Sequence, residues 1–125
     1  MKIIVAAEDD GPIRQILVEA LSEATGWNVT AVADGATLLE TVGSVHPDLV
    51  LLDVSLPGID GIAAYRMMRE REGMGDVPVL FVTANPERVR RADLAGKVAT
   101  IAKPFRIDAL IARVAELLGE PKPDI

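Results

Sequence analysis

The sequence has no cysteine, a single histidine and only four aromatic residues among 125. Without cysteine, a disulfide framework, a thiolate metal site and a cysteine nucleophile are all excluded. The one histidine, His46, has no second histidine or cysteine nearby, which predicts a surface residue rather than a metal ligand. With so few aromatic rings, the core must be built from Val, Leu, Ile and Ala, which suits a buried sheet covered by helices.

The sequence also lacks a long hydrophobic run and an excess of positive charge. The apolar stretch 3–7 is too short for a signal-peptide core and runs directly into three acidic residues, so we expect a cytoplasmic protein with no membrane contact. Thirteen basic residues against nineteen acidic ones give a net charge of −6. Because that charge repels polyphosphate, we do not expect direct binding of nucleic acid.

Five short apolar runs alternate with segments of helical period along the chain. This alternation is typical of βα units around a parallel sheet, and the length fits one domain of roughly 100–200 residues. The sequence therefore predicts an α/β fold, a doubly wound five-stranded parallel sheet with helices on both faces. The expected strands are Ile3–Ala7, Val29–Val32, Leu49–Leu52, Val77–Val82 and Val98–Ala102.

Helical stripes fill the intervals between these strands. The clearest is an apolar stripe that ends before Gly26 and comprises Ile13, Ile16, Leu17, Ala20, Leu21 and Ala24. Further helices are expected around 38–42, 62–68, 86–94 and 110–118, with Asp10 and Asp60 as N-caps of the first and third. The fourth has few apolar residues and carries Arg88, Arg90 and Arg91, which predict a solvated face or a partner contact. We assign residues 1–119 to the domain and 120–125 to a flexible tail, because two prolines interrupt that segment.

Polar residues directly follow four of the five expected strands. Glu8 and Asp9 follow the first, Asp53 the third, Thr83 the fourth and Lys103 the fifth. Ligands of open parallel sheets bind at this carboxyl edge, and carboxylates that meet there repel one another unless cations neutralise them. A hard divalent ion such as Mg²⁺, together with a mobile lysine, would do so. This combination indicates phosphoryl transfer onto a carboxylate.

Four sequence motifs together resemble the receiver (CheY-like) domain of two-component response regulators over essentially the whole chain. They are VAAEDDGPIR, VLLDVSLPGIDG, VPVLFVTAN and AKPF, in this order. The spacings also match that family, since Asp53 lies 44 residues after Asp9 and Thr83 lies 30 residues after Asp53. The resemblance implies a flavodoxin-like sheet with strand order 2-1-3-4-5 and suggests a stand-alone single-domain regulator.

The resemblance also implies a role for each polar residue of the carboxyl edge. Asp53 would be the phosphoacceptor and a metal ligand, Asp9 a direct Mg²⁺ ligand, and Glu8 its partner acid acting through water. The backbone carbonyl of Ser55 would complete the ligands from the protein. Thr83 would bind one phosphoryl oxygen after phosphorylation.

Lys103 would pair with another phosphoryl oxygen, aimed inward by a cis peptide bond before Pro104. The implied function is a signalling switch rather than a turnover enzyme. A sensor histidine kinase or a histidine phosphotransfer protein would donate the phosphoryl group to Asp53. The signal would then pass to a protein target through the face formed by the fourth helix, the fifth strand and the fifth helix.

The chain departs from the family pattern at two points. Thr100 stands where receivers commonly have an aromatic switch residue, and the 20-residue interval from Thr83 to Lys103 is short, which implies a reduced fourth helix or loop. Thr100 therefore keeps open a pseudo-receiver that binds partners without phosphorylation. A haloacid-dehalogenase-like phosphatase is less favoured, because Ser55 replaces its second acid. A flavodoxin-like electron carrier would need a Ser/Thr/Gly-rich loop after the first strand, which is missing.

Overall fold

In the computed structural model, which describes residues 1–121 and 123, five parallel strands form one sheet with the order β2-β1-β3-β4-β5. The fold class and the strand order are as predicted. Three strands have the predicted bounds, while the second and fourth begin or end within two residues of them. The strands are β1 (Ile3–Ala7), β2 (Asn28–Val32), β3 (Leu49–Leu52), β4 (Val79–Thr83) and β5 (Val98–Ala102).

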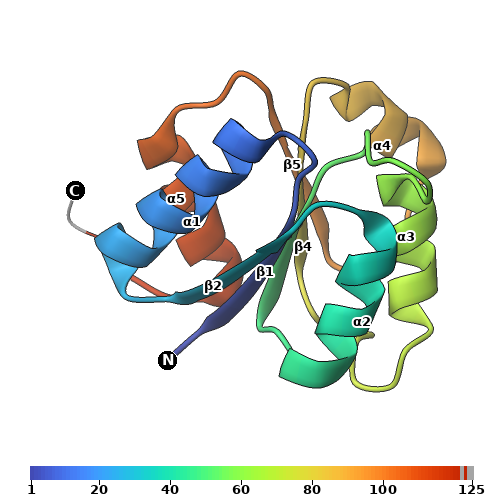
Figure 1. Ribbon diagram of the computed structural model, residues 1–125, viewed down its shortest axis with the longest axis horizontal. Coiled ribbons are helices and arrows are strands. Elements are labelled where there is room, and N and C mark those ends of the chain that lie inside the picture. Colours follow the sequence, from blue (N-terminus) through green and yellow to red (C-terminus); the bar gives the residue numbers. More distant parts are fainter. Residues whose placement is uncertain (122, 124–125) are drawn as a thin grey trace.

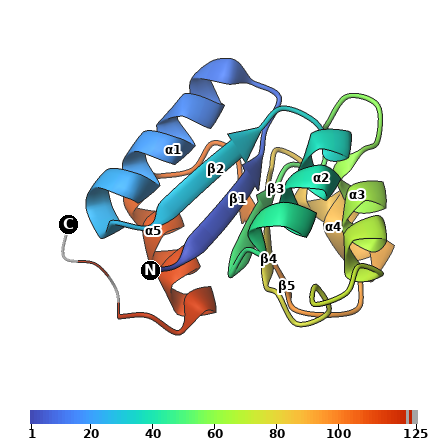
Figure 2. The same cartoon turned by 60° about the horizontal axis from the view of Figure 1, so that its bottom comes forward.

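Helices cover both faces of this sheet (Figures 1 and 2). On one face lie α1 (Gly11–Thr25) and α5 (Ile107–Leu118), and on the other α2 (Gly35–Val45), α3 (Gly61–Arg69) and α4 (Pro86–Ala92). With seven residues, α4 is the shortest of these five helices, in keeping with the short interval from Thr83 to Lys103. None of the helices within residues 1–121 is both long and apolar enough to cross a membrane. The predicted tail 120–125 includes Lys122, Asp124 and Ile125, which lie outside the described residues.

The core consists of two apolar clusters separated by the sheet. All four residues of β3 and all five of β4 are buried, because each strand has neighbours on both sides and helices on both faces. The strands β2 and β5 are less buried than the central strands. Most of their residues are only partly buried, because each lies at an edge of the sheet.

Aspartates begin three of the helices. The side chains of Asp10, Asp34 and Asp60 accept hydrogen bonds of 3.0, 2.7 and 2.9 Å from backbone N–H groups three residues further on. Such caps typically contribute about 1 kcal/mol each. The predicted N-cap roles of Asp10 and Asp60 are confirmed.

The apolar stripe of α1 is only partly a core stripe. Leu17 and Leu21 are buried, whereas Ile16 is 46% exposed. Ile16 lies at the margin of the stripe and borders an open recess. The recess that Ile16 borders is also lined by Lys103.

One partly buried arginine, Arg69, ties α3 to two loops. Arg69 donates from Nε to the Tyr65 hydroxyl over 2.8 Å, and its guanidinium lies 4.7 Å from the centre of the Tyr65 ring. The Tyr65 hydroxyl in turn donates to the carbonyl of Ala95. We call this group the Arg69 clasp; the other carbonyls that accept from Arg69 are those of Met74 (2.6 Å), Val77 (2.6 Å) and Lys97 (3.1 Å). It holds the α3–β4 and α4–β5 loops against the same helix.

Candidate functional site

Three strand ends supply the polar residues of the carboxyl edge. Ala7 of β1 pairs with Leu52 of β3. The residues that follow these two, Glu8 and Asp53, therefore lie side by side at the edge of the sheet. Lys103 follows β5 and reaches the same place from across β4. The strand order and register thus bring together residues that are 95 positions apart in the chain.

Three carboxylates meet at this edge. Glu8, Asp9 and Asp53 each place an oxygen atom within 4.8 Å of the others. Glu8 is 1% exposed and Asp53 5% exposed, while Asp9 is open to solvent. Because two of the acids are buried, their mutual repulsion is poorly screened, and the cluster attracts cations.

Lys103 supplies one positive charge to this cluster. Its ammonium group donates to Glu8 and, over 2.8 Å, to Asp53. Burial raises the pKa of the Glu8 carboxyl even though the hydrogen bond from Lys103 opposes that effect. For Lys103, burial acts to lower the pKa, but hydrogen bonds to Asp53 and Glu8 outweigh it and raise the pKa above its ordinary value. Lys103 therefore stays charged at neutral pH.

The cluster fits a hard divalent cation. Its donors are carboxylate oxygens, the ligands preferred by Mg²⁺, and a single lysine cannot neutralise three carboxylates. Asp9, the exposed member, is available from solvent. The residues predicted from the sequence as metal ligands thus include three that the structure places together.

The backbone around Asp53 is packed tightly against the start of α3. Ser55 N–H donates to Asp53 Oδ1 over 3.1 Å, and Gly61 N–H donates to the Val54 carbonyl over 2.8 Å. A Cβ atom added to Gly61 would lie 2.0 Å from the Asp53 carbonyl oxygen, which no side chain can tolerate. Glycine at this position lets the helix approach the strand end. The predicted ligation by the Ser55 carbonyl stays a prediction.

Thr83 is the last residue of β4 and is hydrogen-bonded to Lys103, the residue that follows β5. Its side chain is buried and accepts a 3.0 Å hydrogen bond from Asn85 N–H, while its carbonyl accepts a 2.9 Å bond from Lys103 N–H. The peptide bond between Lys103 and Pro104 is cis, as predicted. Contact between Thr83 and a phosphoryl oxygen stays a prediction.

Arg14 is a residue of the site that sequence reasoning missed. Its guanidinium donates to the backbone carbonyls of Glu8 (2.8 Å) and Asp9 (3.3 Å), and so orients the acidic loop from α1. The residue lies within the motif VAAEDDGPIR. Its acceptors are backbone groups in a loop, so neither helical spacing nor charge pairing could reveal the contact.

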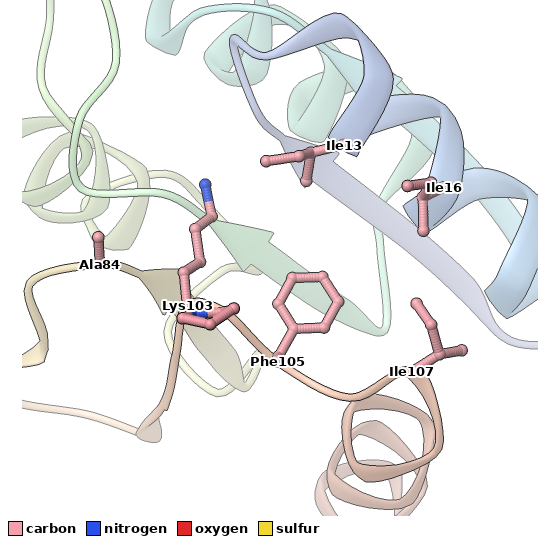
Figure 3. Close-up of a pocket in the computed structure, with 7 residues that line it drawn as sticks. Ile13, Ile16, Ala84, Lys103, Phe105 and Ile107 are labelled. Atoms are coloured by element: carbon pink, nitrogen blue, oxygen red, sulfur yellow. The ribbon is translucent and has the colours of Figure 1, made fainter.

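An apolar recess opens beside Lys103 (Figure 3). It has a volume of about 520 Å³, and Figure 3 shows side chains from α1, from the segment after Lys103 and from the start of α5 around it. It is lined by Ile13, Ile16, Ala84, Lys103, Pro104, Phe105 and Ile107. An exposed apolar surface thus adjoins the charged cluster.

Comparison with known proteins identifies relatives over nearly the whole chain. The chain is 38% identical to the response regulator MprA of Mycobacterium leprae over 97% of its own length, and 37% identical to MprA of Mycobacterium tuberculosis. It spans about half the length of these curated relatives (53% and 52%). The match therefore does not extend to the other half of these relatives.

Solved structures agree with the sequence relatives. The receiver domain of the sensor histidine kinase PA1611 from Pseudomonas aeruginosa, solved with a magnesium ion in its active-site cleft, is 30% identical. The TM-score is 0.82, with 95% of this chain and 98% of that one covered. The Vibrio cholerae chemotaxis protein CheY4 is 25% identical with a TM-score of 0.86, covering 94% and 98%.

The residues from 4 to 115, which include the acidic cluster and Lys103, match the response regulator receiver domain family. The chain therefore belongs to this family and is a receiver domain of two-component signalling, a phosphorylation-based switch.

Proposed function

We propose that Asp53 accepts a phosphoryl group from the phosphohistidine of a sensor histidine kinase or a histidine phosphotransfer protein. The observation that carries this proposal is the position of the Asp53 carboxylate, which is buried between two other acids and hydrogen-bonded to Lys103. An acid in such a place is costly to bury without a function or a partner.

The transfer is a displacement at phosphorus. A carboxylate oxygen of Asp53 attacks, the phosphorus–nitrogen bond to the donor imidazole breaks, and the imidazole leaves with the electron pair and takes up a proton. Lys103 pairs with one phosphoryl oxygen and the Thr83 hydroxyl donates to another. Hydrolysis of the acyl phosphate resets the switch.

Magnesium is the cofactor that suits this site. Asp9, Asp53 and the Ser55 carbonyl would hold Mg²⁺ directly and Glu8 through water, and the ion would supply neutralisation of the phosphoryl charge. The magnesium ion in the PA1611 receiver domain supports this assignment.

The donor protein is expected to approach over the apolar recess. Lys103 lines this recess, so a helix packed against Ile16, Phe105 and Ile107 would carry its phosphohistidine toward Asp53. The exposure of Ile16 supports this role, because an apolar side chain on the surface is available for burial in a complex.

The phosphorylated domain then acts on its target through the face formed by α4, β5 and α5. Phosphorylation shifts a population between two states of that face, and binding of the partner reads the shift. A phosphorylation-independent receiver is the second candidate, favoured by Thr100, whose small side chain cannot act as an aromatic switch.

The test is incubation with Mg²⁺ and acetyl phosphate followed by intact mass. We expect the addition of one phosphoryl group, abolished by EDTA and by Asp53→Asn. The matched control is Asp10→Asn, which changes a neighbouring acid but keeps a good N-cap, and it should be labelled like the wild type. Labelling of Asp53→Asn would disprove the assignment, and absence of labelling in the wild type would favour the second candidate.

A further inference from the structure

A hollow separates α4 from β5 on the face of the sheet opposite α1 and α5. Its volume is about 260 Å³, and it is lined by Val89, Arg90, Asp93, Leu94, Val98, Ala99 and Thr100. Because β5 is the edge strand, nothing in the sheet covers this side. Thr100 pairs with the buried Phe81 of β4 and offers only a small side chain toward the space.

The hollow has an apolar floor and a charged rim. Val89 is buried, and Val98 and Leu94 pack against the same core cluster, so apolar atoms form its base. At the rim, the side chain of Arg90 is 64% exposed and that of its neighbour Arg91 is 80% exposed. Both pair with Glu87, and Asp93 also lines the hollow, so the rim carries charges of both signs, with the two arginines more exposed than Glu87.

The charge of this region is opposite to that of the rest of the chain. Residues 86–97, which form α4 and the loop that leads to β5, contain four basic and two acidic residues, whereas residues 1–85 contain five basic and thirteen acidic ones. A partner that approaches α4 and β5 therefore meets a locally basic surface on an acidic protein. Such a charge distribution favours a partner that binds through a short acidic segment. The net charge of −6 on the whole chain disfavours binding of an extended polyanion.

We propose that the downstream partner presents an acidic segment whose one large apolar side chain fills the hollow above Thr100. A closed apolar cavity of about 150 Å³ accommodates benzene, so the observed space has room for a ring or a leucine. The inference rests on the proposed output face and adds the chemistry of what binds there. A second copy of this chain fits less well, because a two-fold contact would bring the basic surface against itself.

The experiment selects random twelve-residue peptides displayed on phage against the protein treated with Mg²⁺ and acetyl phosphate. We expect the selected peptides to share acidic residues around one Phe, Trp, Leu or Ile. Their affinities are then measured by fluorescence anisotropy for the wild type and three variants. Thr100→Tyr fills the hollow, Arg90→Glu reverses charge at its rim, and Arg71→Glu makes the same change at an exposed site outside it.

We expect at least a tenfold loss of affinity in Thr100→Tyr and in Arg90→Glu, and an unchanged affinity in Arg71→Glu. Arg90 is exposed, so its variant tests the inference even if Thr100→Tyr fails to fold. Unchanged binding in both, or selection of neutral or basic peptides, would overturn the inference. Dimerisation of the wild type that Arg90→Glu abolishes, measured by analytical sedimentation, would also overturn it. Intact mass after acetyl phosphate treatment separates failure of this inference from failure of the proposed function. Position 100 lies outside the acidic cluster, so Thr100→Tyr should still be phosphorylated.

Discussion

Lys103 and Arg69 are two largely buried cations that meet opposite kinds of oxygen. Lys103 lies among carboxylates, those of Glu8 and Asp53. Arg69 lies among neutral groups, the Tyr65 hydroxyl and backbone carbonyls of two loops. A cation held by neutral carbonyls joins the loops that carry them, so its role is structural. A cation held by carboxylates neutralises their charge, and another cation that enters the site can do the same. The cations bound at that site can therefore be exchanged.

The largest expected effect is that of removing the arginine. Arg69→Ala removes the donor to the Met74 and Val77 carbonyls, whereas the Lys97 carbonyl keeps its bond from Val79 N–H. The variant should lower the free energy of unfolding by about 2–4 kcal/mol in urea denaturation. Arg69→Lys should recover only part of this loss, because a point charge cannot span carbonyls from both loops. A midpoint within error of the wild type for Arg69→Ala would show that the clasp is not structural.

Replacing the lysine should have a smaller effect that depends on metal. Without Mg²⁺, Lys103→Ala leaves Glu8 and Asp53 without their hydrogen-bond donor, and because Lys103 is itself partly exposed the variant should cost about 1–3 kcal/mol. Saturating Mg²⁺ should return much of this stability, since an ion that binds only the folded state stabilises it. The measurement is urea denaturation with Mg²⁺ and with EDTA. An equal return in Arg69→Ala would remove the distinction between the two cations.

Within the acidic cluster, the two N-terminal acids should differ in their effect on metal binding. Asp9→Ala should weaken Mg²⁺ binding by about tenfold to a hundredfold, and more than Glu8→Ala does, because a direct ligand contributes more than one acting through water. A calorimetric titration gives both constants. The reverse order would exchange the roles of the two residues.

The smallest effect is a pH dependence confined to the carboxylate site. Burial raises the pKa of Glu8, so the folded protein binds this proton more tightly than the unfolded chain does. The resulting stability is present below the unfolded pKa of about 4.3 and is lost as pH rises through the raised folded pKa. In EDTA, Glu8→Gln should therefore gain stability relative to the wild type over that window, as measured by urea denaturation at several pH values. A difference that stays constant with pH would contradict this.

The fold and the charged cluster were largely predictable from the sequence, because both depend on side chains. Short apolar runs mark the strands, and polar residues directly after them must meet at one edge of a parallel sheet. The contacts of Arg14 and Arg69 were not predictable, because their acceptors are backbone carbonyls that every residue possesses. The exposure of Ile16 was missed for a related reason: helical period shows which residues share a stripe, but not how far the neighbouring helix covers it.

Gly61 shows how a residue without a side chain can decide whether a signal is sent. Any substitution there forces α3 away from the Asp53 backbone, and so displaces the proposed phosphoacceptor without replacing any residue proposed to hold phosphate or metal. In a genetic screen for mutants that fail to signal, alleles at position 61 would be expected alongside those at Asp53 itself. In such alleles the acid would still be present but displaced, so suppressors that restore the close approach of helix and strand should rescue them.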